Sequence, residues 1–296
     1  MQRNFNYSVI IPHHNIPNLL QRCLDSIPRR NDIQIIVVDD NSNPEFVDFD
    51  KFPGMNDSSV EVYLTKEGKG AGYARNVGLK YAKGIWIIFA DADDFFVPNA
   101  FSIIDNYLDN NADMILFKSQ SVDSETFEVM KRNVTTNSAI DEYLEGRLTA
   151  KNVALRYYVP WGRMIKSNFI RDNDIHFDEI VVSNDVMFAT KAACKTDEIQ
   201  ISSNIIYCIT FRKGSLWNSK RNIDIRIKTH IRRNSYILKY GYKEDIIPVI
   251  VCIHKWCKHS LKLYLKCLYI AISSGVLFQG FFLYIKRKMR NKKFHN

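Results

Sequence analysis

The feature that most restricts the fold of this chain is a regular alternation of strand-like and helix-like segments near its start. "YSVIIP" (7–12) and "IQIIVVDD" (33–40) are β-branched runs bounded by turn residues, which is typical of buried strands. Between them, "NLLQRCLDSI" (18–27) repeats its apolar residues at helical spacing. Together these segments predict a βαβ unit, whose two strands lie parallel in one sheet.

The same alternation continues along the next part of the chain. Further strands are expected at 60–65, 84–90 and 112–119, with helices at 73–82 and 98–110. Near-continuous apolar strands that alternate with helices indicate an α/β, Rossmann-like fold with a mostly parallel sheet flanked by helices. A hydrophobic content of 46% supports a substantial core. Sheets of this kind bind ligands beyond the carboxyl ends of their strands.

Acidic residues follow two of the predicted strands. Asp39 and Asp40 end the second strand, whereas Asp91, Asp93 and Asp94 follow the strand "GIWIIFA". For the first pair, an Asx-type turn at a strand end is an alternative explanation. In an extended chain two carboxylates on the same side repel each other unless they share a proton or a cation. Mg²⁺ or Mn²⁺ would resolve this conflict and leave coordination sites for phosphate oxygens. The second cluster therefore predicts a divalent ion and a phosphate.

Other phosphate and metal motifs do not fit these residues. An EF-hand loop that starts at Asp91 needs an oxygen ligand at its fifth position and Gly at its sixth, where this chain has Phe95 and Phe96. A phosphatase with an aspartyl nucleophile should carry its acids on the first strand. "GKGAGYARN" (68–76) lacks the order G-x-x-x-x-G-K-[ST] of a P-loop. Its glycines are expected to let the backbone pass close to a nucleotide, and Arg75 to supply a cation.

Seven motifs follow one another over residues 7–217: "SVIIPHHN", "IIVVDDNSN", "GAGYARNVGL", "FADADDFF", "VPWGRMIKSNFI", "NDVMF" and "YCITFRKGSLW". In this order they resemble the motifs of the family 2 inverting glycosyltransferases of the GT-A fold. Three positions depart from the usual pattern of that family: His14 replaces an aromatic residue, Gly162-Arg163 replaces Asn-Lys, and Asn184 replaces Glu.

The resemblance implies how a nucleotide-sugar donor is bound. Asp39, together with Arg75 and the backbone from Pro12 to Asn15, would hold the base of a nucleotide sugar, most often one linked to UDP. Asp91 would face the ribose. These assignments rest on motif positions, so the structure must bring the residues to one edge of the sheet.

The resemblance also implies the metal and acceptor sites. Asp93, helped by Asp94, would bind Mn²⁺ or Mg²⁺ on the diphosphate, and Arg212 with Ser215 would close on the same diphosphate. Trp161 would line the acceptor side. Ordinary core packing is the alternative for this tryptophan.

The resemblance makes Asp185 the general base. Inverting transfer needs charge neutralised on the departing nucleoside diphosphate and a proton removed from the acceptor hydroxyl, and a carboxylate on the opposite face would take that proton. The alternative is that Asp185 is an N-cap or first-turn acid of the predicted helix 184–194. Because Asn184 stands in place of Glu, Asp178 or Glu179 could serve as the base instead.

The last part of the chain differs from the first in charge. From Phe211 onward there are 20 basic and three acidic residues, a formal charge of +17, whereas residues 1–210 carry −8. We therefore predict a catalytic, nucleotide-sugar-binding domain at 1–217 and a basic amphipathic helical region at 218–296. Helices are expected there at 223–240, 246–270 and 273–293.

The basic region is predicted to contact an anionic membrane surface. A terminal "KRKMRNKK" (286–293) would attract anionic lipid; nucleic acid is the rival partner, but the resemblance favours a membrane. Polar residues interrupt 267–285, so this segment is expected to lie in the interface and not to span it. A solvated face on a packed helix is the alternative. The predicted basic face is Lys255, His259, Lys262 and Lys266, and the predicted apolar face is Ile253, Trp256, Leu261, Tyr264 and Leu268.

These features combine into one functional hypothesis. The chain is expected to be a metal-dependent inverting hexosyl- or N-acetylhexosaminyltransferase that acts on a glycan or lipid-linked acceptor in cell-surface polysaccharide biosynthesis. The alternative is a non-catalytic GT-A relative that binds nucleotide sugars or nucleic acid through its basic half. The absence of a signal-peptide pattern and of any CxxC pair among the six cysteines predicts reduced thiols and a cytoplasmic protein. We expect it on the cytoplasmic face of the inner membrane.

Overall fold

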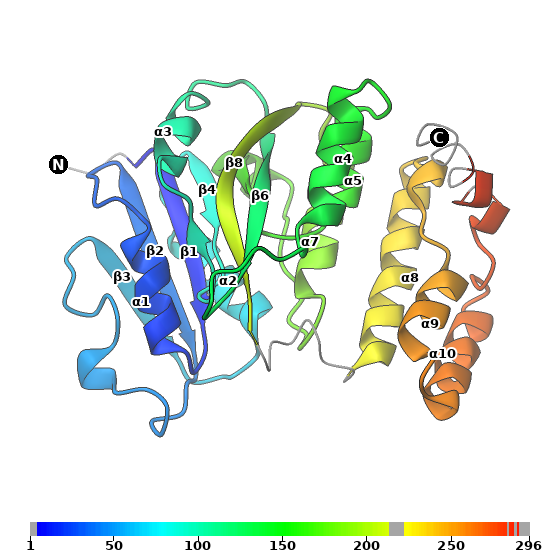
Figure 1. Cartoon of the computed structure of the whole chain (residues 1–296), viewed down its shortest axis with the longest axis horizontal. Coiled ribbons are helices and arrows are strands. Elements are labelled where there is room, and N and C mark those ends of the chain that lie inside the picture. Colours follow the sequence, from blue (N-terminus) through cyan, green and yellow to red (C-terminus); the bar gives the residue numbers. More distant parts are fainter. Residues whose placement is uncertain (1–4, 213–221, 283, 287–288, 290–296) are drawn as a thin grey trace. The chain divides into compact units, whose positions relative to one another are not determined.

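The computed structural model describes residues 5–212, 222–282, 284–286 and 289. The chain divides into two compact units, residues 1–215 and 216–296, and each is described by itself. Figure 1 shows the elements of both units along the sequence. A separate function for each unit stays a prediction.

The N-terminal unit is built on one sheet. Among the described residues its eight strands lie in the order β3-β2-β1-β4-β7-β6-β8-β5. The first four strands of that order are parallel, and His13 pairs with Asp39, so β1 and β2 end together at one edge. The bounds are β1 (Tyr7–His13), β2 (Ile33–Asp40), β3 (Val60–Thr65), β4 (Trp86–Phe89), β5 (Phe95–Phe96), β6 (Met114–Asp123), β7 (Arg163–Lys166) and β8 (Ile199–Phe211).

The other half of the sheet mixes strand directions. β7 runs antiparallel to both β4 and β6, whereas β6 and β8 are parallel. The short β5 pairs antiparallel with β8, through Phe95 opposite Cys208 and Phe96 opposite Tyr207. This pairing attaches the segment after β4 to a strand more than 100 residues later in the chain. The predicted α/β fold with a mostly parallel sheet is confirmed.

Helices cover the sheet on both faces. The crossover from β1 to β2 and the crossover from β3 to β4 run in opposite directions, so right-handed connections place α1 and α2 on opposite faces. α2 packs closely against β1, since a Cβ at Gly78 would lie 2.4 Å from Cγ2 of Ile10. The helices are α1 (Pro17–Asp25), η1 (Phe49–Lys51), α2 (Ala71–Tyr81), α3 (Ala100–Asp105), α4 (Val134–Leu144), α5 (Ala150–Arg156), α6 (Ser167–Asp172) and α7 (Asn184–Lys195).

The predicted elements of the first 120 residues are present with shifted ends, whereas β5, β7, β8, α4, α5 and α6 were not predicted. The early strands could be predicted from continuous apolar runs because every residue of β1 and β2 is buried. α1 shows the expected one-sided pattern, with Leu20, Cys23 and Leu24 buried and Pro17 at its start. All six cysteines are free and buried, as expected.

The C-terminal unit is helical. Its described elements are α8 (Ile223–Lys239), η3 (Lys243–Asp245), α9 (Val249–Cys257) and α10 (Leu261–Ser273). They enclose a small core of their own: Ile223, Ile227, Val249, Cys252, Ile253, Cys257, Cys267, Ala271 and Val276.

The predicted continuous helix over 246–270 is wrong. α9 ends at Cys257, and a separate helix, α10, begins after Ser260. The Ser260 side chain accepts a hydrogen bond from the Leu263 amide at 3.3 Å. Ser260 is therefore an N-cap, which supplies an acceptor that an uninterrupted helix would not need.

The break also overturns the predicted apolar face. Ile253 is fully buried in the core, and Trp256 and Tyr264 pack against that core. Lys255 belongs to α9 and Lys262 to α10, so the expected row of basic residues is not one helix face. No helix in the described ranges is long and apolar enough to cross a membrane. Of the terminal basic block, only Lys286 and Met289 lie within the described residues.

Candidate active site

Three carboxylates converge just beyond the end of β4. One carboxylate oxygen from each of Asp91, Asp93 and Asp94 lies within 4.8 Å of the others. In contrast to the extended chain that was expected here, these residues form a turn. In this turn the Asp94 amide donates to the Asp91 carbonyl at 3.0 Å. The turn brings the side chains together more closely than alternate strand positions would.

Contacts from α1 and β8 hold this turn in place. The backbone amide of Thr210 donates to the Asp94 carboxylate at 2.7 Å, and the Asp91 amide donates to the Tyr207 hydroxyl at 2.8 Å. The Asp93 carbonyl accepts from Arg22 and from the Thr210 hydroxyl, each at 2.6 Å. Sequence reasoning missed these three supporting residues because no local pattern marks them.

The electrostatics of the cluster favour a bound cation. Burial raises the pKa of Asp94 well above its usual range, and the charges of Asp93 and Asp91 raise it further. Burial, followed by the charge of Asp91, also raises the pKa of Asp93, while Arg212 opposes the shift. Both directions mean that negative charge is unfavourable here without a counter-ion. Three converging hard oxygen donors of this kind fit a divalent ion such as Mn²⁺ or Mg²⁺.

Two residues with separate predicted tasks contact each other. Nε of Arg212 lies 3.1 Å from Oδ2 of Asp93, so the predicted phosphate-binding cation is paired with the predicted metal ligand. Arg212 therefore lies at the cluster, and its assignment to the diphosphate stays a prediction. Ser215, its predicted partner on the diphosphate, lies outside the described residues.

Arg75 links the acidic turn to the start of α7. Its guanidinium donates to Asp91 at 2.5 Å and to the Asn184 side chain at 2.9 Å, and it lies over the ring of Phe177 at 5.2 Å. The arginine is 5% exposed. Asn184, which stands where the family usually has Glu, thus accepts a hydrogen bond from Arg75 without adding charge to the site.

Asp185 lies in the first turn of α7, beside the same arginine. The N-cap of α7 is Ser183, so the N-cap alternative for Asp185 is wrong, while the first-turn alternative matches its position. Burial raises the pKa of Asp185, the charge of Arg75 lowers it, and the charge of Asp91 adds a smaller increase. Part of the side chain is exposed to solvent. This environment suits a carboxylate that must accept a proton.

Glu179, one of the two alternative bases, is engaged away from the acidic turn. Glu179 accepts from the Asn76 side chain at 3.5 Å and lies 3.9 Å from the Lys69 ammonium, on the side of the glycine loop. The Asp178 amide donates to the Asn184 carbonyl at 3.1 Å, and the Asp178 carbonyl packs against α2. The charges of Arg75 and Asp91 act on Asp185, which places this acid near the cluster.

Asp39 sits in a buried network at the ends of β1 and β2. Its carboxylate contacts Nδ1 of His13 at 2.7 Å and accepts from the Ser42 hydroxyl at 2.5 Å and the Ser42 amide at 2.9 Å. The Ile16 amide donates to Nε2 of His13, which leaves the imidazole proton on Nδ1, toward Asp39. These bonds lower the pKa of Asp39 against the opposing effect of burial.

The loops after β1 and β2 are bonded to each other. Asn15 has a left-handed backbone (φ +59°), and its amide donates to the Ser42 hydroxyl at 2.8 Å. Its side-chain oxygen accepts from the Asn43 amide at 2.7 Å. Pro12 is buried near the end of β1. The predicted base-binding residues Pro12, Asn15 and Asp39 are therefore brought together at one edge.

Asp40 organises the glycine loop that follows β3. Its carboxylate accepts from the amides of Lys69 at 3.1 Å and Gly70 at 2.6 Å. A Cβ at Gly72 would lie 2.1 Å from the Asp178 carbonyl oxygen. The close approach at Gly72 is thus made to the loop before α7, and an approach of the other glycines to a nucleotide stays a prediction. Asp40 and the Asp178 loop set the position of Arg75 on α2.

Trp161 lies beside the acidic turn but is largely enclosed. It is 7% exposed and stacks on Tyr207, with ring centres 5.9 Å apart and planes at 10°. The Tyr207 hydroxyl accepts from the Asp91 amide, so Trp161 is one residue removed from the cluster. Its packing matches the core alternative, and its assignment to the acceptor stays a prediction.

The residues after Trp161 form a tight turn around Tyr157. Gly162 has φ +65°, and a Cβ there would lie 2.2 Å from the Tyr157 hydroxyl. Arg163 is fully buried, donates to the Tyr157 carbonyl and lies over the Tyr157 ring at 5.1 Å. Burial lowers the pKa of Arg163 to about 10, against the charges of Tyr157 and Asp185. The replacement of Asn-Lys by Gly-Arg therefore changes how this turn packs.

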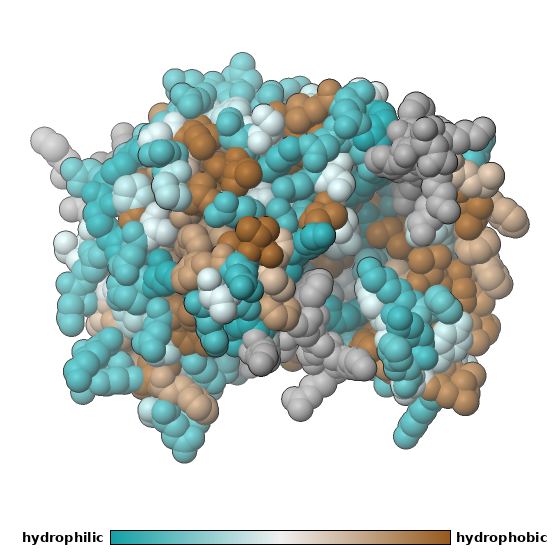
Figure 2. Space-filling view, in the orientation of Figure 1, coloured by the Kyte–Doolittle hydropathy of each residue, from teal (hydrophilic) through white to brown (hydrophobic). Residues whose placement is uncertain are grey.

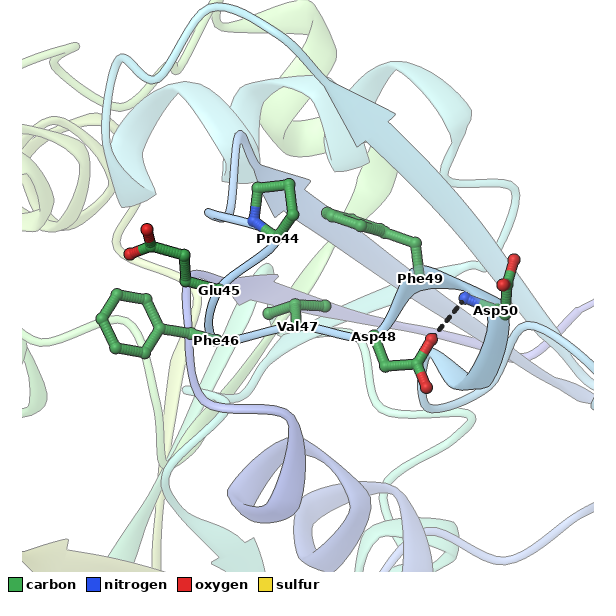
Figure 3. A pocket seen from close by; sticks show the side chains of 7 residues that line it. All are labelled: Pro44, Glu45, Phe46, Val47, Asp48, Phe49 and Asp50. Atoms are coloured by element: carbon green, nitrogen blue, oxygen red, sulfur yellow. Dashed lines mark hydrogen bonds between the residues drawn. The ribbon is translucent and has the colours of Figure 1, made fainter.

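A pocket of about 570 Å³ lies on the loop after β2. Figure 3 shows that its lining comes from consecutive residues of that one loop, from Pro44 to Asp50. None of the predicted site residues lines it. Because the loop directly follows the Asp39–Asn43 network, the pocket borders the predicted base-binding edge but does not include the acidic cluster.

Comparisons with known proteins agree with this geometry. The profile of glycosyl transferase family 2 matches residues 8–169. The chain is 26% identical over 224 residues to the poly(ribitol-phosphate) beta-N-acetylglucosaminyltransferase TarS of Staphylococcus aureus, covering 72% of this chain and 37% of TarS. It is 25% identical over 252 residues to the poly(ribitol-phosphate) beta-glucosyltransferase of Bacillus spizizenii, covering 82% of this chain and 36% of the relative. The chain thus spans little more than a third of the length of these curated relatives.

Solved structures resemble the whole chain. TarS 1–349 in complex with UDP-GlcNAc matches with a TM-score of 0.71 at 19% identity, covering 91% of this chain and 81% of that structure. The mannosyltransferase PcManGT of Pyrobaculum calidifontis, in complex with GDP-Man and Mn²⁺, matches with a TM-score of 0.56 at 16% identity, covering 97% and 81%. At such identities the likeness shows the fold, and the predicted GT-A fold is confirmed.

Proposed function

We propose that this chain, which belongs to glycosyl transferase family 2, transfers a sugar from a nucleotide sugar to a glycan or lipid-linked acceptor in surface-polysaccharide biosynthesis. One observation carries the proposal: the acidic turn, Arg75 and Asp185 lie together at one edge of the sheet. Separate parts of the sequence supply these groups, and a purely structural role would not require their convergence.

The acidic turn would hold the metal ion. Asp93 and Asp94 are the proposed ligands, with Asp91 close enough to assist, and Mn²⁺ or Mg²⁺ are the ions that their oxygen donors fit. A bound ion would neutralise charge on the diphosphate leaving group. The Mn²⁺ in the PcManGT complex supports this choice. Arg212 must exchange its contact with Asp93 for the diphosphate as the donor binds.

The donor would lie along the ends of β1, β2 and β4. In this proposal Pro12, Asn15 and Asp39 hold the base, Arg75 fixes Asp91, and Asp91 meets the ribose. The loops that carry these residues are already bonded to one another, so little ordering is needed when the donor binds. UDP is the proposed nucleotide, supported by the UDP-GlcNAc bound to TarS 1–349.

Asp185 would act as the general base. Its carboxylate takes the proton from an acceptor hydroxyl while that oxygen bonds to the anomeric carbon, and the bond from that carbon to the nucleoside diphosphate breaks with inversion. The raised pKa makes Asp185 a stronger base than an exposed aspartate, and the charge of Arg75 favours its ionised form. Trp161 is the proposed acceptor-side residue, because it stacks on Tyr207, whose hydroxyl bonds the acidic turn.

The acceptor class is proposed from the relatives. Two curated relatives bear names that specify poly(ribitol-phosphate) and transfer of N-acetylglucosamine or glucose. A phosphate-rich polymer or a lipid-linked glycan is therefore the proposed acceptor, and a hexose or N-acetylhexosamine the proposed sugar. An anionic membrane surface on the cytoplasmic side is the proposed location, and nucleic acid is not a proposed partner.

The experiment is a panel of UDP- and GDP-sugars incubated with the full chain and Mn²⁺, with release of nucleoside diphosphate as the measurement. We expect release from at least one UDP-hexose or UDP-N-acetylhexosamine, and its loss when EDTA removes the metal. Tight donor binding by calorimetry with no release, in the presence of acceptor extracts, would instead support the non-catalytic alternative. Equal release with EDTA would reject the metal-dependent mechanism.

A further inference from the structure

α10 carries a row of exposed apolar side chains. Leu261 is 75% exposed, Leu265 55%, Tyr269 73% and Ile272 57%. Their spacing of four, four and three residues places them on one side of the helix. We call these four residues the α10 stripe. An isolated exposed apolar residue is ordinary, but four in one row form a continuous surface that water solvates poorly.

The α10 stripe is separate from the side that stabilises the fold. Cys267 and Ala271 face the core of the C-terminal unit, and Leu263, Tyr264 and Ile270 pack against that core. α10 is therefore apolar on two sides, and folding uses only one of them. More than half of each stripe side chain is left exposed by the packing, so the apolar character of this side needs another explanation.

Positive charges border the α10 stripe. Lys262 and Lys266 lie on the same helix, next to the stripe by helical position, and Lys258 precedes the helix; all three are exposed. Asp224 pairs with Lys266 at 2.8 Å. From Phe211 onward the chain has only two other acids, Glu244 and Asp245, against 20 basic residues. Among the described residues, three lysines therefore border the stripe, and Asp224 pairs with one of them.

Exposed apolar residues continue after α10. Phe278 is 64% exposed and Phe282 85%. Figure 2 shows hydrophobic surface at the right of the view, where Figure 1 places α10 and the segment that follows it. The exposed apolar surface is thus not confined to one turn of a single helix.

We propose that the α10 stripe seats the protein on an anionic lipid surface, with α10 lying along the interface. The apolar side chains would enter the boundary between headgroups and acyl chains, and the bordering lysines would meet lipid phosphates. This orientation agrees with the finding that no described helix is suited to cross a membrane.

Two other partners fit the surface less well. A second copy packed stripe to stripe would bring its bordering lysines close to those of the first copy, and these like charges would repel. Nucleic acid would satisfy the lysines but leave the leucines and Ile272 without an apolar partner. An anionic lipid surface satisfies both kinds of residue. The inference adds a contact to the proposed function and does not depend on catalysis.

Co-sedimentation of the full chain with vesicles tests the inference without any donor sugar. The vesicles contain equal parts of phosphatidylglycerol and phosphatidylcholine, and pure phosphatidylcholine vesicles serve for comparison. The double variant Leu265→Ser/Tyr269→Ser should bind the anionic vesicles roughly ten- to a hundredfold more weakly, since two apolar side chains no longer enter the interface. The control is Val129→Ser/Leu144→Ser, whose targets are 86% and 53% exposed in the N-terminal unit and which should bind as the intact chain does.

A charge variant separates the two contributions. Lys262→Gln should weaken binding to the anionic vesicles about fivefold and leave binding to phosphatidylcholine unchanged, whereas Lys80→Gln on α2 should change neither. Because Lys262 is exposed, this test holds even if the double variant folds poorly, which thermal melting would reveal.

Several outcomes would overturn the inference. Binding of the folded double variant equal to that of the intact chain would remove the α10 stripe from the contact. Absence of vesicle binding by the intact chain would reject a lipid partner. Light scattering without lipid that shows the intact chain as an oligomer and the double variant as a monomer would assign the stripe to a protein interface instead.

Discussion

The acidic edge of the N-terminal unit and the lysines around the α10 stripe of the C-terminal unit differ in how their charged side chains are held. At the edge, each carboxylate is held by specific donors, such as the Thr210 amide on Asp94 and Arg75 on Asp91. Around the α10 stripe, lysines project from exposed positions, and the one ion pair there is Lys266 with Asp224 among the described residues. A reaction needs fixed distances, whereas adhesion to a fluid surface needs only charge and apolar area.

The contrast has a consequence for how each region responds to change. Buried, directed contacts depend on single atoms and are only weakly screened by salt. Exposed charges act together and are screened within about 10 Å at ~0.1 M salt. Single substitutions should therefore have large effects at the acidic edge and graded effects in the C-terminal unit.

The largest effect is expected at Asp93. Asp93→Ala should abolish metal-dependent binding of UDP, because the turn loses a proposed metal ligand and Arg212 loses its partner. Calorimetry with UDP and Mn²⁺ measures this, and the melting temperature should stay near that of the intact chain. Unchanged affinity in the variant would show that the cluster does not hold the metal, and the contrast between the two regions would lose its basis.

Asp185→Asn is expected to reduce turnover by about 10²- to 10⁴-fold, the usual contribution of a general base. Asn preserves the size of the side chain and suits the first turn of a helix, so donor affinity and melting temperature should be nearly unchanged. Steady-state kinetics and calorimetry on the same preparation separate these quantities.

The pH dependence of turnover provides a second measurement on Asp185. A base must be ionised, and the pKa of Asp185 is raised, so turnover should increase with pH through that raised value and then level off. The acid limb should therefore lie above the pH range of an ordinary aspartate, and Asp185→Asn should lack it. Near-normal turnover in the variant would move the base assignment to Asp178 or Glu179, which the same substitutions test.

The smallest expected effect is a difference in stability between substitutions at two glycines, one in each unit. Gly162 and Gly275 both have left-handed backbones, with φ +65° and +68°. A Cβ at Gly162 would meet the Tyr157 hydroxyl at 2.2 Å, whereas a Cβ at Gly275 meets nothing within 4 Å. Gly275→Ala should cost about 1–2 kcal/mol for the backbone alone, and Gly162→Ala a further 1–3 kcal/mol or so for the crowding.

Urea unfolding of each variant and of the intact chain, followed by circular dichroism, measures the two losses in the free energy of unfolding. Equal losses in the two variants would mean that the turn around Tyr157 relaxes as easily as the exposed turn before Val276. The N-terminal unit would then be less tightly packed than its contacts indicate.

What the sequence determined by itself was local. β-branched runs and helical spacing located β1, α1, β2 and α2, because periodicity reflects which side of an element is buried. The acids after β4 were visible because they stand together in the chain, and the order of motifs identified the family. Ser260 is of a residue type that favours helix N-caps, and the predicted continuous helix was wrong because it did not take this residue into account.

The tertiary structure decided which distant groups meet. Tyr207 and Thr210 reach the acidic turn only because β8 pairs with β5 and β6, and Arg22 reaches it from α1. No local pattern encodes contacts across more than 70 residues, since they follow from the order of strands in the sheet. The same reason applies to the α10 stripe, because α10 is apolar on two sides and only packing against α8 and α9 decides which side remains exposed.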